Sequence, residues 1–139
     1  MAAEDRKDFE TLVREGYLLL PEWVRRKMSN VALLVEDRPS RGVRREQGLG
    51  SGETLLGYYR GTPLTARGSD YGVGATLPDT ITLYRKPIEE EAGGDPEEVK
   101  RVVAETVWHE VAHHFGMDED AIEEREREVK KRADDRLLP

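Results

Sequence analysis

The sequence predicts a single domain that combines helices with a few short β-strands. Its 139 residues suffice for one hydrophobic core and leave little room for a second domain. Apolar residues at helical spacing alternate along the chain with short apolar runs bounded by glycine and proline, which are typical of strands. Charged and hydrophobic residues each make up 37% of the chain, which favours a compact protein over disorder. We therefore expect residues 1–139 to form one domain.

The N-terminal part predicts two helices followed by a strand. Apolar residues recur at helical intervals in the first segment, and Pro21 fits the first turn of a second helix. We expect these helices around residues 5–17 and 21–28. Residues 31–35 are five apolar residues in a row, which predicts a buried central strand.

A glycine-rich and arginine-rich segment follows at residues 40–54. It contains four glycines and three arginines without an apolar period, so we expect a mobile loop. The arginines at positions 38–45 offer an alternative, a patch that binds nucleic acid. The net charge of −7 weighs against this alternative, because the mean field of the protein would repel phosphate.

Two further strands are expected, at residues 55–60 and from Ile81 to Ile88. Side chains alternate along the second of these segments, as they do in strands. Pro87 lies near its end, and a proline is tolerated mainly in an edge strand because it cannot donate a hydrogen bond to the sheet. An extended peptide can pair with the unpaired backbone groups of such an edge.

Composition limits the cellular setting and the partners. The first ten residues mix acids and bases and contain no apolar run, so we expect neither a signal peptide nor a membrane anchor, and a cytoplasmic location. The chain has no cysteine, which excludes disulfides and leaves His, Asp and Glu as the strong metal ligands. One Asn, one Gln and far more Arg than Lys form a profile typical of proteins from hot environments.

A long helix is expected at residues 96–115. Asp95 is a typical N-cap, Pro96 fits the first helical position, and Gly116 fits the end of the helix. All three histidines of the chain lie in residues 109–114. The predicted helix therefore carries every imidazole of the protein in its last two turns.

His109 and His113 have the spacing of two ligands to one metal ion. Four residues of α-helix separate them by about 40° around the axis and about 6 Å along it, so both rings can reach one ion. Glu110 directly follows the first histidine, where a carboxylate can bond to a metal-bound water without binding the metal. This is the H-E-x-x-H arrangement of zinc peptidases.

A third ligand is needed, because catalytic zinc usually has three protein ligands. His114 is turned by about 100° from the preceding histidine, so it should point away from the shared ion. Gly116 allows the chain to turn, and Glu119 then occupies the last position of the extended H-E-x-x-H-x-x-G-x-x-H pattern, which makes it our expected third ligand. Asp120 is the next alternative, and Asp118 fits better as the N-cap of a last helix. Acids at a helix start are also favoured by the helix dipole without any metal.

At this motif the sequence resembles the small zincin-like metallopeptidases, the "minimal zincin" group of short bacterial proteins. The resemblance implies an α+β fold in which a small mixed β-sheet packs against the H-E-x-x-H helix and an edge strand runs along the cleft. It implies His109 and His113 as zinc ligands and Glu110 as general base. It also implies that the segment from Ile81 to Ile88 aligns the substrate.

Residues of this predicted edge strand are then the expected substrate-binding residues, namely Thr82, Tyr84 and Arg85. Tyr84, Arg85 and Tyr71 are also candidates to stabilise the oxyanion. The chain departs from the metzincin branch at Glu119, where that branch has a histidine. It also lacks a methionine after Met117, so we do not expect the Met-turn or the full metzincin architecture.

These observations predict a zinc-dependent metallopeptidase that acts on a peptide or protein substrate. Zinc would activate a water, and Glu110 would take the proton of that water. The alternative is a non-catalytic zinc-binding or interaction module with a degenerate protease site. The small size of the chain favours this alternative, because little room remains for both a core and a deep cleft.

Overall fold

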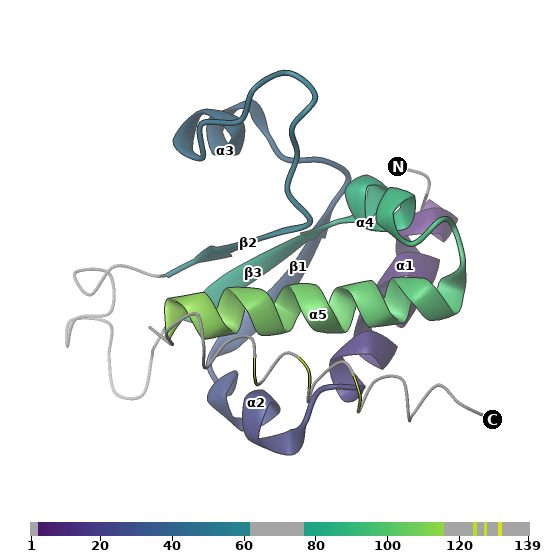
Figure 1. The fold of residues 1–139 in the computed structure, drawn as a ribbon, viewed down its shortest axis with the longest axis vertical. Coiled ribbons are helices and arrows are strands. Elements are labelled where there is room, and N and C mark those ends of the chain that lie inside the picture. Colours follow the sequence, from purple (N-terminus) through teal and green to yellow (C-terminus); the bar gives the residue numbers. More distant parts are fainter. Residues whose placement is uncertain (1–2, 62–76, 116–123, 125–126, 128–130, 132–139) are drawn as a thin grey trace.

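The computed structural model describes residues 3–61 and 77–115, together with residues 124, 127 and 131. The predicted α+β fold, with a small mixed sheet against a long helix, is confirmed (Figure 1). In chain order the described elements are α1 (Ala3–Leu18), α2 (Glu22–Lys27), β1 (Val31–Glu36), α3 (Arg41–Glu46), β2 (Gly57–Arg60), β3 (Asp79–Tyr84), α4 (Arg85–Glu91) and α5 (Pro96–His114).

The three described strands form one sheet in the order β1-β3-β2. The central strand β3 runs parallel to β1, with Ile81 opposite Leu33. It runs antiparallel to β2, with Ile81 opposite Tyr59. The two outer strands β1 and β2 are therefore the edges of the described sheet.

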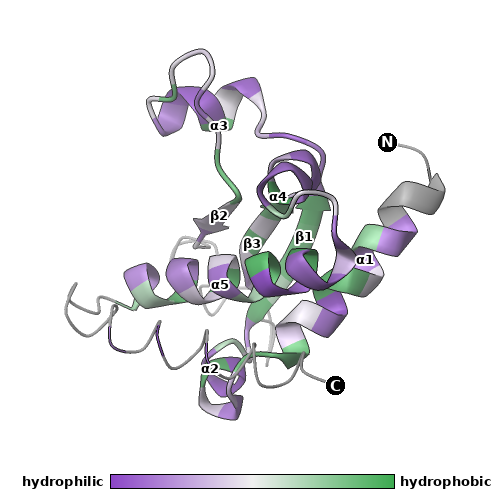
Figure 2. Cartoon of the chain, turned by 45° about the vertical axis from the view of Figure 1, so that its right-hand side comes forward, coloured by the Kyte–Doolittle hydropathy of each residue, from purple (hydrophilic) through white to green (hydrophobic). Residues whose placement is uncertain are grey.

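The core lies between one face of this sheet and the helices α1 and α5. Ile81 and Leu83 are fully buried on β3. Figure 2 shows β1 largely in the green of hydrophobic residues. Trp108 on α5 is 1% exposed and packs edge-to-face on Trp23, with ring centroids 5.5 Å apart. The side chains from the helices that complete the core include Phe9, Val13, Val24, Val99, Val103, Val107 and Val111.

Helices α1 and α5 cross closely because a glycine lies at their contact. A Cβ atom on Gly16 would lie 2.8 Å from the carbonyl oxygen of Lys100 and 2.9 Å from a methyl carbon of Val103. Those distances are shorter than van der Waals contact, so only glycine fits this position without a shift of α5. This packing fixes α5, the helix that carries the histidines.

The long helix begins as predicted. The side chain of Asp95 accepts a hydrogen bond from the N–H of Glu97, and Pro96 is the first residue of α5. The helix ends at His114, while Gly116, the predicted stop, lies outside the described residues. Nine side chains of α5 are buried, which fixes the rotation of the helix about its axis.

The predicted edge strand from Ile81 to Ile88 is wrong in its length and its place. β3 ends at Tyr84, and the residues from Arg85 onward form α4. Pro87 is the third residue of that helix, where its missing N–H breaks no helical hydrogen bond. The proline therefore reflects the start of a helix, and β3 is the central strand.

The predicted central strand at residues 31–35 is correspondingly an edge. β1 pairs only with β3 in the described sheet, and Leu34 is 46% exposed. An unbroken apolar run is typical of a strand covered on both faces. Here only one face of β1 lies against the helices. The apolar run therefore predicts more burial than this strand has.

The predicted loop at residues 40–54 contains the short helix α3. The Ser40 hydroxyl oxygen accepts the N–H of Val43 at 3.2 Å, which caps the helix. Arg44 donates to the carbonyl oxygens of Gly50 at 2.7 Å and Glu53 at 2.8 Å. These bonds hold the turn after the helix, so Arg44, one of the arginines considered for nucleic acid, binds the protein's own main chain.

Candidate active site

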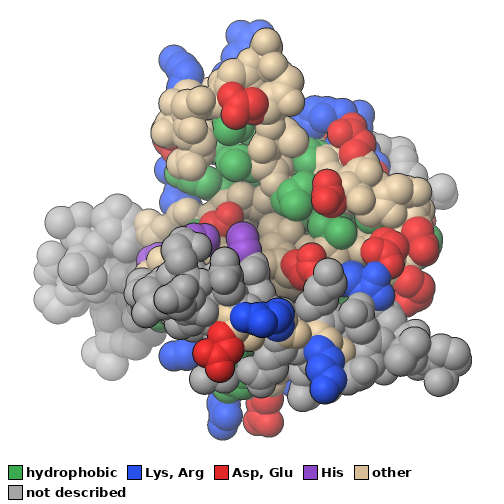
Figure 3. All heavy atoms as spheres, in the orientation of Figure 1, with side chains coloured by type: hydrophobic (Ala, Val, Ile, Leu, Met, Phe, Trp, Pro, Cys, Tyr) green, Lys and Arg blue, Asp and Glu red, His purple; other side chains and the backbone are tan. Residues whose placement is uncertain are grey.

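The two histidines of the motif lie on one exposed side of the last turns of α5. The ring centroids of His109 and His113 are 5.5 Å apart, and the ring planes are perpendicular. Two imidazoles bound to one zinc ion through nitrogens at about 2.0–2.1 Å have centroids about 5 Å apart. The observed centroid distance is close to this value. Figure 3 shows histidine side chains reaching the surface.

The candidates for a third ligand lie outside the described part of the chain. Glu119, Asp120 and Asp118 all fall in the segment that the structure does not describe. Among the described residues, no group of three or more His, Asp or Glu side chains could hold a metal ion. The assignment of Glu119 therefore stays a prediction.

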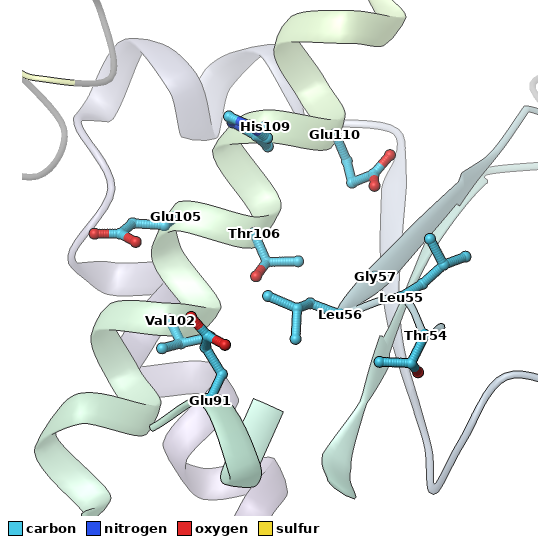
Figure 4. A pocket seen from close by; sticks show the side chains of 10 residues that line it. All are labelled: Thr54, Leu55, Leu56, Gly57, Glu91, Val102, Glu105, Thr106, His109 and Glu110. Atoms are coloured by element: carbon cyan, nitrogen blue, oxygen red, sulfur yellow. The ribbon is translucent and has the colours of Figure 1, made fainter. Parts of the chain in front are cut away.

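Glu110 points from α5 toward strand β2 (Figure 4). Its carboxylate accepts a hydrogen bond from the main-chain N–H of Tyr59. Burial raises the pKa of Glu110 above its ordinary value, while the Tyr59 N–H and the nearby His113 and His109 act in the opposite direction. The carboxyl group is thus partly withdrawn from water beside the histidine pair.

His114 is held against the sheet, on another side of α5. Its ring stacks on the ring of Tyr59, with centroids 3.9 Å apart and planes 15° apart. Its Nε2 atom lies 3.7 Å from a carboxylate oxygen of Asp79, and that oxygen accepts the Tyr59 hydroxyl at 2.6 Å. This position agrees with the helix geometry, which directs His114 away from the ion that the other two histidines would share.

A cleft of about 550 Å³ lies between α5 and the start of β2 (Figure 4). His109 and Glu110 form one part of its wall, and Glu91, at the end of α4, forms another. The other described residues that line it are Thr54, Leu55, Leu56, Gly57, Val102, Glu105 and Thr106. The motif residues His109 and Glu110 therefore border a space large enough for a side chain of another molecule.

Strand β2 comes close to α5 because Gly57 has no side chain. A Cβ atom at this position would lie 2.7 Å from the Cγ2 methyl of Thr106. The N–H of Tyr84 donates to the carbonyl of Leu56 at 3.0 Å. Since paired residues alternate in an antiparallel ladder, the main-chain groups of Gly57 and Tyr59 then point away from β3, toward the free edge. β2 is therefore the edge strand of the described sheet that borders the cleft.

The residues expected to bind substrate do not line this cleft. Thr82 lies in the central strand. Tyr84 is 1% exposed, and burial is the main cause that raises its pKa to about 12. Arg85 pairs with Asp37 at 3.0 Å and with Glu89 at 2.7 Å. The edge-strand prediction that suggested these three residues is therefore wrong, and Tyr71 lies outside the described residues.

Sequence reasoning missed Gly57, Tyr59 and Asp79. The one available signal was Gly57, because a glycine inside a strand often marks a close approach of another backbone or side chain. Nothing local marks Tyr59 or Asp79, which meet His114 only through the tertiary fold.

A comparison with known protein families shows to which family this chain belongs. The model of a family described as zincin-like metallopeptidase matches residues 28–129. The chain belongs to this family. A search of curated proteins finds no match to the chain. For this zincin-like protein, none of the described helices has the length and apolar character that a membrane crossing requires.

Proposed function

We propose that this zincin-like protein is a zinc-dependent peptidase with Glu110 as its general base. The observation that carries the proposal is the position of Glu110, between the histidine pair on α5 and the free edge of β2. His109 and His113 would hold the ion, with Glu119 as the expected third ligand and Asp120 as the next alternative. Zinc held there would supply Lewis acidity for both the attacking water and the scissile carbonyl.

The main chain of β2 suits the alignment of an extended peptide. The N–H and C=O of Gly57 point toward the free edge, and a peptide strand can pair with such groups. Such a peptide would lie beside Glu110, because the neighbouring Tyr59 already contacts that carboxylate. Alignment by β2 replaces the role that the sequence suggested for Thr82, Tyr84 and Arg85.

Glu110 would move the proton during hydrolysis. Its carboxylate takes a proton from the attacking water and delivers it to the leaving amine. Burial raises its pKa, and a raised pKa strengthens a carboxylate as a base. Its hydrogen bond from the Tyr59 N–H holds the side chain on the side of the cleft.

The test compares zinc-loaded wild type with Glu110→Gln on a broad peptide mixture, with zinc content and thermal stability measured on both. We expect cleavage by the wild type and a loss of about 100-fold or more in the variant, at equal zinc content. Glu97→Gln, the same substitution near the start of α5, is the matched control and should keep full activity.

Two other results would change the proposal. Full hydrolysis by Glu110→Gln would show that another group is the base. No hydrolysis by a wild type that binds zinc and loses much of its stability on chelation would favour the non-catalytic metal-binding module.

A further inference from the structure

The cleft extends well beyond the proposed catalytic centre. Val102, Thr106 and Glu110 line it at intervals of four residues along α5, so its wall is about 12 Å long. His109 and Glu110 lie at one end of this wall, and Glu91 from α4 lies beside Val102 toward the other end (Figure 4). The cleft can therefore accept a long side chain that enters beside the catalytic groups.

The middle of the cleft is apolar. Leu56 faces Thr106 across it, and Val102 continues the same face of α5 (Figure 4). Val102 is 9% exposed and Thr106 is 8% exposed, so both belong to a firmly packed part of the helix. A hydrocarbon stem is the chemical group that this surface suits.

The charged side chains described in the lining of the cleft are mainly acidic. Among the described residues, the acids that line the cleft are Glu91, Glu105 and Glu110, and no described lysine or arginine lines it. A cationic group at the end of the stem would therefore be attracted by the described charges of this lining.

Glu91 differs from its two acidic neighbours on α4. Glu89 pairs with Arg85 at 2.7 Å, and Glu90 pairs with Arg38 at 3.1 Å. Within the described part of the chain, Glu91 forms no ion pair, although it lies at the cleft. Among the described basic residues, none therefore competes with a ligand for this carboxylate.

We propose that the cleft binds the side chain of a lysine or arginine next to the cleaved bond, and that Glu91 sets this preference. The stem of such a side chain packs on Leu56 and Val102, and its cationic end reaches Glu91. The proposal rests on the proposed peptidase function and names its substrate class, peptides and proteins with a basic residue at the cleavage site.

The experiment uses the full-length zinc-loaded protein and three peptides that differ in one residue next to the cleaved bond. That residue is lysine, norleucine or glutamate, so stem and charge are tested separately. We expect kcat/KM to be about tenfold higher for lysine than for norleucine, and lowest for glutamate. Glu91→Gln should reduce the lysine advantage to about twofold or less, while Glu97→Gln, which removes the same charge away from the cleft, should keep it.

Binding of the same fluorescent peptides, measured by anisotropy, separates failure of this proposal from failure of the proposed function. Cleavage with equal kcat/KM for lysine and norleucine, or a lysine preference that persists in Glu91→Gln, would overturn the basic specificity alone. A second outcome is that no cleavage occurs, while binding is selective for lysine and this selectivity is lost in Glu91→Gln. That outcome would overturn the peptidase function and support the binding of a basic side chain in the cleft. Absence of both cleavage and lysine-selective binding would overturn both.

Discussion

Glu110 on α5 and Tyr59 on the edge strand β2 are joined by a hydrogen bond from the Tyr59 main-chain N–H to the Glu110 carboxylate. The same tyrosine stacks its ring on His114 and donates its hydroxyl to Asp79. One residue thereby links the helix of the H-E-x-x-H motif to the strand that borders the cleft. The position of β2 relative to the proposed base depends on these contacts.

Variants of Tyr59 should separate its hydroxyl from its ring. Tyr59→Phe removes the bond to Asp79 and keeps the ring stack, so we expect a loss of about 1 kcal/mol of stability and near-normal hydrolysis. Tyr59→Ala also removes the stack on His114, and we expect kcat to fall further because β2 is no longer held beside Glu110. Urea unfolding and steady-state kinetics measure the two effects. Normal kcat in Tyr59→Ala would mean that the ring does not position the strand.

Adding one methyl group to the edge strand should disturb the site. Gly57→Ala places a Cβ 2.7 Å from the Cγ2 of Thr106, and such overpacking typically costs about 1–3 kcal/mol. We expect lower stability and slower hydrolysis, because β2 must move away from α5. Thr106→Ser removes Cγ2, so the double variant should recover much of both losses. A Gly57→Ala protein that equals the wild type would contradict the close packing.

The sequence was sufficient to predict the helix that carries the H-E-x-x-H motif and the place of the histidines in its last turns. Asp95, Pro96 and the four-residue spacing of the histidines are local signals, and α5 follows them. The place of each strand in the sheet is decided by pairing between distant segments. The local sequence pattern does not contain this information, so it wrongly predicted β3 as an edge strand. Pro87 supported the wrong prediction of an edge strand, because a proline fits both an edge strand and the first turn of a helix.

The stability of the metal-free protein should depend on pH through Glu110. Its pKa is raised in the folded state, mainly by burial, so the protonated form is favoured by folding. This contribution is fully present below the unfolded-state pKa, near the ordinary value of 4.5, and is lost as pH rises through the higher folded-state pKa. Glu110→Gln should therefore melt at a higher temperature than the wild type at pH 8. That advantage should shrink as the pH falls toward 4.5. A difference that is constant with pH, or opposite in sign, would contradict the burial of this carboxyl group.

The most direct test of the proposed metal centre is the zinc content per chain after exhaustive dialysis, without a histidine tag. We predict about one equivalent in the wild type, little or none in His109→Ala, and about one equivalent in His114→Ala, since His114 is held by Tyr59 and Asp79. Zinc that is absent from the wild type even after it is added back, or that persists in His109→Ala, would contradict the account.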